Sequence, residues 1–536
     1  MPEHRVASVH DLAEGEMKQV AAGGTDVLLS RLGGGFHACG ARCTHYGAPL
    51  AEGVLHDGCV VCPWHHARFD VRTGALADPP ALDALPRYAV RVEGADVYVT
   101  VPSDAEETPE GASYRESGGH PPAHAAEVTD DRLFAIVGAG AAGGVAAETL
   151  RAAGFGGRIV MITQEDERPY DRTALSKGLL GGEVGDEALP LRDDAFYRRL
   201  GVEAWVGRRV TRLDAAAREI HFADGSSLRY DRALVATGGA PRRLDVPGAD
   251  ADGVFTLRSH ADARRIVQAA KAGQRAVVVG SSFIGMEAAA QLRQRGLDVT
   301  VVSHDRVPFE VVLGEAVGQM LREAHEAQGV RFHLEAGVER IEPANGRLRV
   351  RLSGGTAADA DLVLVGIGVT PATDVLEGVE RHEDGGVLVD AHLRAAEGLW
   401  AAGDIVHVPS PQTGERLRIE HWRVAQQHGR VAAFGMAGRE AVYDGVPFFW
   451  SGQFDVRPRY LGHAEAWDEV VLDGDLDTGD AIAYYVRGDR VLAACGIGRD
   501  RAMAALHALM LAGETPTAAD VRAGFDPLAA VGAGAS

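Results

Sequence analysis

Four residues with metal-binding side chains stand in two short segments near the start of the chain. Cys43 and His45 are followed, after sixteen intervening residues, by Cys62 and His65. Two thiolates and two imidazoles suit a [2Fe–2S] cluster in which cysteines hold one iron and histidines the other. Tetrahedral zinc is the alternative. Zinc fingers normally pair Cys with Cys and His with His, so one of each in both segments favours the iron–sulfur cluster.

The residues around these ligands are similar to the loops of soluble Rieske ferredoxins. The two loops are Cys-Thr-His-Tyr-Gly-Ala-Pro-Leu (43–50) and Cys-Pro-Trp-His (62–65). Respiratory-chain Rieske proteins carry an additional cysteine in each loop, at the places of Ala48 and Trp64, and a serine at the place of Ala67. Because that disulfide and that hydroxyl donor are missing, the resemblance implies a low-potential, ferredoxin-like centre.

His66 stands where ferredoxin-type loops usually have glycine. We expect an exposed imidazole there, and the alternative is a further ligand or a proton-linked modulator. Cys39 and Cys59 are expected to be buried small side chains beside the loops. With five cysteines in all, unevenly placed, the chain has no disulfide framework.

A dinucleotide-binding fingerprint follows an apolar strand in the second quarter of the chain. Gly138, Gly140 and Gly143 form G-x-G-x-x-G, and an alanine-rich helical segment comes next. Such glycines permit a tight turn that brings the backbone and a helix N-terminus to a pyrophosphate. Glu165, 22 residues beyond Gly143, can accept hydrogen bonds from an adenosine ribose, with Asp166 as its rival.

The same pattern recurs at Gly280 and Gly285, with serine in place of the middle glycine. The strand after it ends at Ser303, where an acidic residue usually recognises the 2′-hydroxyl of NADH. Asp305 favours NADH, whereas Arg306 could pair with the 2′-phosphate of NADPH. We expect NADH, with NADPH as the alternative.

The length of 536 residues has room for several domains. Short β runs separated by glycine and proline come first, and a segment rich in Glu, Pro, Gly and Ser then indicates a linker. The expected division is an all-β Rieske domain (1–102), a linker (103–130), an FAD-binding domain (131–248 and 376–445), an NAD(P)H-binding domain (249–375) and an α+β domain (446–536).

Composition and charge exclude several classes of function. A net charge of -22 disfavours nucleic acid as a partner. The N-terminus lacks the apolar stretch of a signal peptide, and no window reaches the roughly 18 apolar residues of a membrane span. We therefore expect a cytoplasmic protein without a membrane partner. The absence of cysteine between Cys62 and Cys495 removes the redox pair of disulfide reductases and the cysteine of peroxidase relatives.

Four motifs in order carry a family resemblance. They are the first fingerprint, Arg-Pro-Tyr-Asp-Arg-Thr-Ala-Leu-Ser-Lys (168–177), Ala-Thr-Gly-Gly (236–239) and Leu-Trp-Ala-Ala-Gly-Asp (399–404). Together they resemble flavoproteins with two dinucleotide domains in a glutathione-reductase-like α/β fold. The nearest groups are Rieske-fused apoptosis-inducing-factor-like oxidoreductases and ferredoxin reductases of aromatic-ring oxygenase systems. The resemblance implies FAD, and cofactor contacts from Arg172, Lys177, Thr237, Gly238, Gly366, Gly368, Asp404 and Trp422.

Three residues are expected to take part in electron transfer. The resemblance places Lys177 beside the flavin, where a cation stabilises the anionic reduced ring, and pairs it with Glu287 near the hydride-transfer site. A surface position is the alternative for Lys177. Trp422 matches an aromatic residue that packs against the flavin on the route of outgoing electrons, and a core tryptophan is the alternative.

The predicted function is an NAD(P)H-dependent FAD reductase. Electrons would pass through the chain's own [2Fe–2S] cluster to an electron-accepting protein, such as an oxygenase. The alternatives are an NAD(P)H-sensing regulatory flavoprotein and a self-contained small-molecule oxidoreductase. The chain could form a homodimer, and electrons could pass from flavin to cluster within one subunit or between two.

Overall fold

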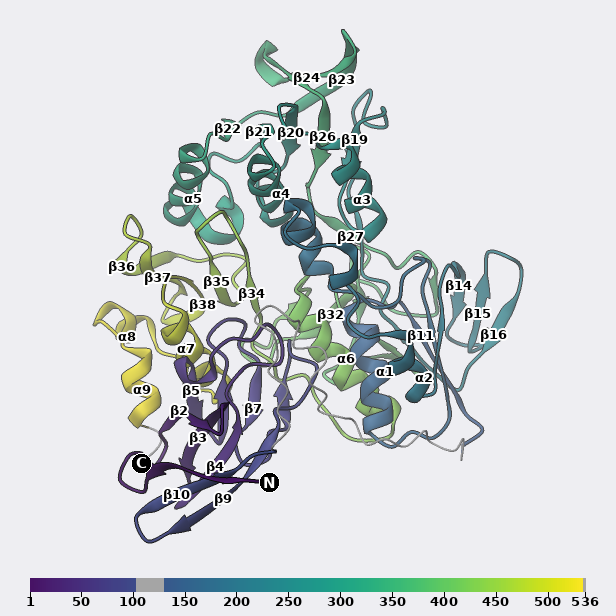
Figure 1. Cartoon of the computed structure of the whole chain (residues 1–536). Helices are drawn as coiled ribbons and strands as arrows, with labels where there is room; N and C mark the ends of the chain where they lie inside the picture. The colour runs from purple at the N-terminus through teal and green to yellow at the C-terminus, as the bar shows by residue number, and fades with distance from the viewer. Residues whose placement is uncertain (103–129, 534–536) are drawn as a thin grey trace.

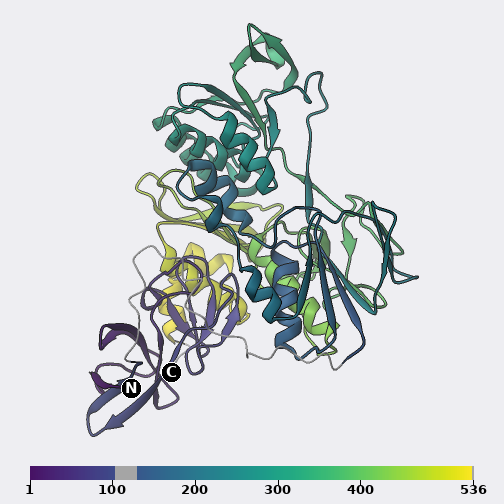
Figure 2. The ribbon, with the colours of Figure 1, turned by 45° about the vertical axis from the view of Figure 1, so that its right-hand side comes forward.

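The computed structural model describes residues 1–102 and 130–533, which form four domains (Figure 1). Except for Asp130, the predicted linker lies outside the described residues. Among the described helices, none is both long enough and apolar enough to cross a membrane. Strands from the first hundred residues lie beside the last helices of the chain, as the purple and yellow segments of Figure 2 show.

The N-terminal domain is all-β, as predicted, and consists of two antiparallel sheets. A six-stranded sheet in the order β1-β10-β9-β4-β3-β2 packs near a four-stranded sheet in the order β5-β6-β7-β8, whose strands frame the second ligand segment. The strands are β1 (Glu3–Ser8), β2 (Met17–Ala22), β3 (Thr25–Leu32), β4 (Gly35–Gly40), β5 (Val54–His56), β6 (Cys59–Val61), β7 (Arg68–Asp70), β8 (Leu76–Asp78), β9 (Arg87–Glu93) and β10 (Asp96–Thr100).

The first dinucleotide domain is built on a sheet in the order β13-β12-β11-β17-β31-β30, parallel except at the β30 edge. Helices cover the sheet, so its central strands are uninterrupted apolar runs. The main elements are β11 (Leu133–Val137), α1 (Ala141–Ala152), β12 (Arg158–Ile162), α2 (Asp194–Arg199), β13 (Val202–Trp205), β17 (Arg232–Val235), β30 (Arg394–Ala396), β31 (Leu399–Ala401) and α6 (Trp422–Met436).

Smaller strands decorate this domain and join it to the next. They are β14 (Val210–Asp214), β15 (Glu219–Phe222), β16 (Ser227–Arg229), β18 (Gly239–Pro241), β27 (Val369–Pro371), β28 (Leu376–Glu377), β29 (Val387–Leu388), β32 (Val406–Pro409) and β33 (Arg416–Leu417).

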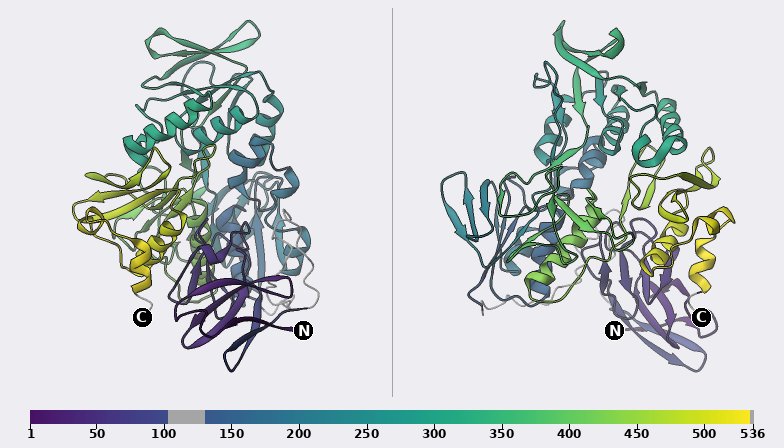
Figure 3. Two further views of the ribbon diagram at one scale, coloured as in Figure 1. Left: turned by 60° about the vertical axis from the view of Figure 1, so that its left-hand side comes forward. Right: turned by 180° about the vertical axis from the view of Figure 1, so that it is seen from behind.

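The second dinucleotide domain repeats the arrangement with the parallel order β19-β26-β20-β21-β22. Its projecting strands β23 and β24 lie at the end of the molecule away from the N-terminal domain (Figure 3). The elements are β19 (Val254–Thr256), α3 (His260–Ala269), β20 (Arg275–Val279), α4 (Phe283–Gln294), β21 (Asp298–Val302), α5 (Glu310–Ala327), β22 (Arg331–His333), β23 (Val338–Ala344), β24 (Arg347–Leu352), β25 (Ala357–Ala360) and β26 (Leu362–Val365).

The C-terminal domain is α+β, as predicted, with one antiparallel sheet in the order β34-β35-β38-β37-β36. Helix α7 packs against this sheet and also against the N-terminal domain, where Val54 and Val61 share an apolar cluster with four residues of α7. The elements are β34 (Phe448–Trp450), β35 (Arg459–Gly462), β36 (Glu469–Asp475), β37 (Asp480–Arg487), β38 (Arg490–Ile497), α7 (Asp500–Leu511), α8 (Ala518–Arg522) and α9 (Pro527–Ala533).

A fully buried arginine fixes the N-terminal domain against the rest of the chain. Arg423 on α6 forms an ion pair with Asp78 and donates through Nε to the Pro79 carbonyl at 2.7 Å. A second ion pair joins Arg192 to Asp83 at 2.8 Å. Burying such charges is favourable only when they are paired, so this interface depends on both carboxylates.

We predict that Asp78→Ala destabilises the chain by about 3–5 kcal/mol, because it leaves the Arg423 guanidinium buried without its anion. The measurement is the free energy of unfolding from a denaturant titration. The matched control is Glu203→Ala. Glu203 pairs with Arg158 where the side chains are 41% and 47% exposed, so its loss should cost about 1 kcal/mol or less. Equal effects of the two variants would contradict a structural role for the buried pair.

Candidate functional site

The two ligand loops of the N-terminal domain have the same backbone geometry. The Cys43 amide donates to the Ala48 carbonyl and the Cys62 amide to the Ala67 carbonyl, each at 2.9 Å. The fourth residue after each cysteine is left-handed, with φ +75° at Gly47 and φ +58° at His66. Glycine adopts this conformation without cost, whereas a residue with a β-carbon loses roughly 1–2 kcal/mol.

These loops bring together the four predicted ligands. His45 Nδ1 lies 3.0 Å from His65 Nδ1. Two imidazole nitrogens reach such a separation when both bind the same metal ion at about 2.1 Å. The Cys43 thiol contacts Cys62, and both cysteines are buried. Thiol beside thiol and imidazole beside imidazole is the pairing that a [2Fe–2S] cluster with mixed ligands requires.

The surroundings of the ligands also suit a cluster. Burial, the neighbouring His45 and the charge of Arg459 hold the pKa of His65 well below its usual value, so the ring is in the neutral form that binds iron. Burial tends to raise the pKa of Cys62, but hydrogen bonds from Cys43 and from the His65 and Trp64 amides lower it. Those amides stabilise a thiolate.

His66 is buried, and the expectation of an exposed imidazole is wrong. Its ring stacks on Phe448 with centroids 3.9 Å apart, and His507 of α7 lies on the same stack with its centroid 4.9 Å from that of His66. The interface with the C-terminal domain therefore offsets the unfavourable left-handed backbone. Cys39 and Cys59 are buried as predicted.

Trp450 is a contact of the ligand histidines that was not predicted from the sequence. Its ring centroid lies 4.3 Å from that of His65 and 5.9 Å from that of His45. It belongs to Pro-Phe-Phe-Trp (447–450), an aromatic cluster in a chain with only 6% aromatic residues, which was the available signal. Tyr46, in the first ligand loop, donates a hydrogen bond to Asp171 in the first dinucleotide domain.

The first glycine turn fits a dinucleotide pyrophosphate. A β-carbon at Gly138 would collide with the Ala236 carbonyl, and one at Gly143 would collide with the Gly138 carbonyl. A β-carbon at Gly140 would meet no atom of the described residues within 4 Å, and would project into open space at the uncapped N-terminus of α1. The turn thus leaves a cradle where α1 can bind phosphate oxygens.

Polar residues predicted to contact FAD form one network beside this turn. Glu165 accepts from the Tyr170 hydroxyl at 2.6 Å and from Arg172 at 2.8 Å. Arg172 also donates to the carbonyl of Arg258, whose guanidinium is 2.7 Å from Asp404 Oδ2. Arg258 was not predicted, and it orients the carboxylate. Asp166, the rival of Glu165, is exposed. The Thr237 hydroxyl donates to the Ala372 carbonyl, and Gly238 has φ +68° beside Arg258.

The predicted Lys177–Glu287 ion pair is present between the two dinucleotide domains. Lys177 Nζ lies 2.8 Å from Glu287 Oε2, and the Glu287 side chain is nearly inaccessible. Ser176 donates to the same oxygen at 2.5 Å, and Ser451 donates to Oε1 at 2.6 Å. With both oxygens bound, the carboxylate holds the lysine in one place.

The second glycine turn has the close packing of the first. A β-carbon at Gly280 would collide with the Gly366 carbonyl, and one at Gly285 with the Gly280 carbonyl. Gly368, at φ +91°, faces open space. Asp305 Oδ2 accepts 2.8 Å hydrogen bonds from Ser281, which follows Gly280, and from Ser303. These bonds hold its carboxylate beside the turn.

Trp422 is the first residue of α6. It is half-buried and packs against the core of the first dinucleotide domain. The contacts of the described residues neither place it beside the ligand histidines nor define its relation to FAD, so its role at the flavin stays a prediction.

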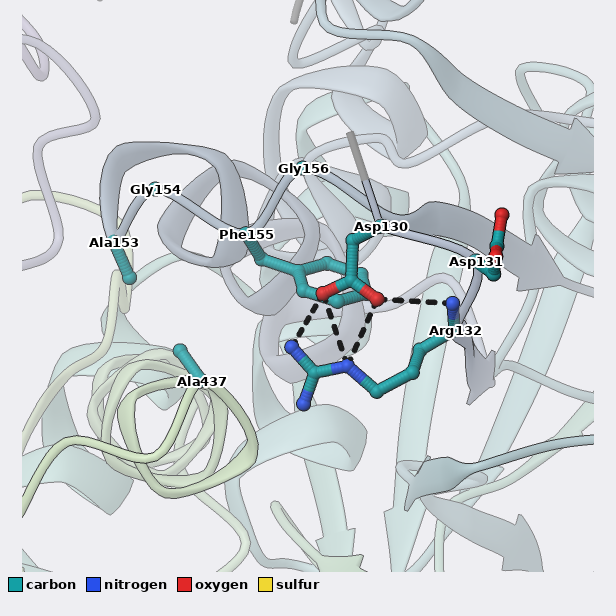
Figure 4. A pocket seen from close by; sticks show the side chains of 8 residues that line it. All are labelled: Asp130, Asp131, Arg132, Ala153, Gly154, Phe155, Gly156 and Ala437. Carbon is teal, nitrogen blue, oxygen red and sulfur yellow. Dashed lines mark hydrogen bonds and ion pairs between the residues drawn. The ribbon is translucent and has the colours of Figure 1, made fainter. Parts of the chain in front are cut away.

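A cavity elsewhere in the first dinucleotide domain is not the cofactor site. Figure 4 shows it lined by Asp130, Arg132 and Phe155, with Arg132 Nε 2.9 Å from Asp130 Oδ1. It lies where β11 begins and α1 ends. In open α/β sheets, ligands bind at the carboxyl ends of the strands, where the glycine turn lies.

Comparisons with known proteins cover every described domain. Residues 133–429 match the family model described as pyridine nucleotide-disulphide oxidoreductase, residues 3–89 match the Rieske [2Fe-2S] domain, and residues 448–531 match the reductase C-terminal domain. Apoptosis-inducing factor 3 of Homo sapiens is 38% identical over 503 residues, which are 93% of this chain and 82% of that protein. The ferredoxin–NAD(+) reductase component of the anthranilate 1,2-dioxygenase system of Burkholderia cepacia is 34% identical, covering 72% of this chain and 95% of that protein.

Solved structures show the same similarity. A ferredoxin reductase from Rhodopseudomonas palustris superposes with a TM-score of 0.70 at 29% identity, covering 75% of this chain and 100% of that chain. A covalent putidaredoxin reductase–putidaredoxin complex gives a TM-score of 0.66 at 29% identity, covering 69% of this chain and 91% of that chain.

We predict that Glu287→Gln slows reduction of the bound flavin by NADH about 10- to 100-fold, because a charged hydrogen bond of about 1.5–3 kcal/mol to Lys177 is lost. Stopped-flow absorbance of the FAD band measures this rate. FAD content should be unchanged, because Glu287 lies outside the first glycine turn. Wild-type reduction kinetics in the variant would contradict the role of the pair.

Proposed function

Because the chain belongs to the pyridine nucleotide-disulphide oxidoreductase family, we propose that it delivers electrons from NADH through FAD and its own [2Fe–2S] cluster to a separate one-electron acceptor. The chain is a ferredoxin-reductase-type NAD(P)H/FAD oxidoreductase with a Rieske domain. The predicted family, fold class and cofactors are thereby confirmed. When bound, FAD takes the hydride of NADH and the cluster carries single electrons, so one NADH reduces two one-electron acceptors and releases a proton.

The observation that carries the proposal is the position of the ligand loops. His65 packs on Trp450, and the next residue, Ser451, holds Glu287 of the Lys177 ion pair. Tyr46 contacts Asp171 in the Pro-Tyr-Asp-Arg segment. Both loops therefore touch elements that border the proposed flavin site, within one chain. A reductase whose electrons were meant only for a separate ferredoxin would have no need of this built-in contact.

The acceptor is proposed to be a redox protein, such as an oxygenase component. Two relatives at 34% and 38% identity are named as reductase components of anthranilate and biphenyl dioxygenase systems. Another relative is named apoptosis-inducing factor 3. For this reason an NAD(P)H-sensing regulatory function is the second candidate.

Turnover of a one-electron acceptor separates these functions. We predict that Cys43→Ser abolishes NADH-driven reduction of cytochrome c while flavin reduction in stopped flow persists, because the cluster loses a ligand. The control is Cys59→Ser, which alters a buried cysteine of the same domain outside the ligand set and should retain turnover. Flavin reduction with negligible cytochrome c turnover in the wild-type holoenzyme would favour the regulatory function and refute electron delivery.

We further propose that Asp305 selects NADH. Its carboxylate is fixed beside the second glycine turn by Ser281 and Ser303, and there it can accept from a ribose 2′-hydroxyl. Arg306, the candidate partner of a 2′-phosphate, is already paired with Glu310 at 2.6 Å and with Glu315 at 3.5 Å. Asp305, two residues beyond Ser303, thus recognises the ribose 2′-hydroxyl in place of the acidic residue that usually stands at the Ser303 position.

Asp305→Ala should reduce the NADH-over-NADPH preference in kcat/KM by about tenfold or more, because an acceptor worth about 1.5–3 kcal/mol is lost and repulsion of a 2′-phosphate is removed. Steady-state kinetics with both nucleotides measure this ratio. Asp298→Ala, at the exposed start of β21, the strand that precedes Asp305, is the matched control. An unchanged ratio for Asp305→Ala would rule out the assignment.

A further inference from the structure

A cationic side chain of the C-terminal domain faces the ligand loops. In the antiparallel pair of β34 and β35, Arg459 stands directly opposite Trp450. Directly opposed residues project from the same face of a sheet. Because the Trp450 ring packs on His65, the Arg459 side chain also extends on the face that covers the cluster site.

Arg459 is buried with incomplete compensation of its charge. Only 6% of its side chain is exposed, and its partner Asp500 is 3.4 Å away and 38% exposed. Nη1 donates to the Arg457 carbonyl at 3.3 Å. Among the described residues Nε has no hydrogen-bond partner. A buried cation with one loose ion pair is costly unless another negative group lies near it.

The cluster site supplies that negative group. Arg459 lies close enough to Cys62 and His65 for its charge to act on both ligands. When both cysteines bind iron as thiolates, the negative charge persists on this side of the site. Reduction adds one more negative charge, and in a site with little water a neighbouring cation stabilises that charge strongly.

We propose that Arg459 is a tuning residue that raises the reduction potential of the [2Fe–2S] cluster from the neighbouring domain. The N-terminal domain itself has alanine at position 67, where a hydroxyl donor would raise the potential, so the upward contribution comes across the interface instead. The C-terminal domain thus makes the docked cluster a better electron acceptor for the flavin. The inference needs the bound cluster but does not depend on the identity of the acceptor.

The test is a redox titration of the holoenzyme, followed by the electron paramagnetic resonance signal of the reduced cluster. We expect Arg459→Met to lower the reduction equilibrium constant about tenfold, which is about 59 mV for a one-electron couple. Arg459→Lys keeps the charge and should retain most of the wild-type potential. Arg457→Met removes the same charge from an exposed position two residues earlier and should leave the potential unchanged, because solvent screens it.

A second variant works in the opposite direction and keeps the arginine. Asp500→Asn removes the anion that partly neutralises Arg459, so it should raise the potential. If Arg459→Met does not retain the cluster, this upward shift decides in favour of the proposal, and an unchanged potential in Asp500→Asn overturns it. Equal shifts in the Met and Lys variants would also overturn it, because they would show an effect of shape and not of charge. The titration uses neither NADH nor a protein acceptor, so its failure leaves the proposed function standing.

Discussion

The side chains of β34 point alternately toward two neighbouring domains, so this one strand contacts both the ligand loops and the region of the Lys177–Glu287 pair. Phe448 and Trp450 pack on His66 and His65. Phe449 points the other way, onto Phe283 at the start of α4, and Ser451 after the strand binds Glu287. Because successive residues of a strand face opposite sides, a shift of one register position would break both sets of contacts together.

The buried Arg423 anchors the segment that leads into β34. It binds the segment Asp78–Pro79 of the N-terminal domain and also donates to the Val446 carbonyl, two residues before β34. One guanidinium therefore connects α6, the start of the C-terminal domain and the ligand-bearing domain. The same interface holds His66 in a left-handed backbone conformation. The matching position of the first ligand loop is occupied by glycine, Gly47. The N-terminal domain behaves as a docked part of the reductase rather than as a tethered module.

Charge is arranged along the same line of contacts. Lys177 and Glu287 neutralise each other at the domain boundary, and their carboxylate is held by serines from two different domains. Arg459, by contrast, is buried with only a loose partner. This difference suits the proposed function, because a nearby cation without full compensation would stabilise the negative charge that reduction adds to the cluster.

The sequence by itself determined which cofactors suit this chain. The spacing of Cys43, His45, Cys62 and His65 and the two glycine turns depend on short segments, whose geometry is a local property of the backbone. The all-β character of the N-terminal domain and the two units of strand, glycine turn and helix likewise followed from local patterns. The Lys177–Glu287 pair also followed from motifs, although its residues are 110 positions apart.

Only the tertiary structure decided how these parts meet. Trp450, Arg459 and the Arg423–Asp78 pair act across domains, in the last case over 345 positions of the chain. No local pattern encodes which distant face a side chain will cover. For the same reason the burial of His66 could not be predicted: its neighbours Phe448 and His507 belong to the C-terminal domain, which reaches His66 only by packing on the N-terminal domain.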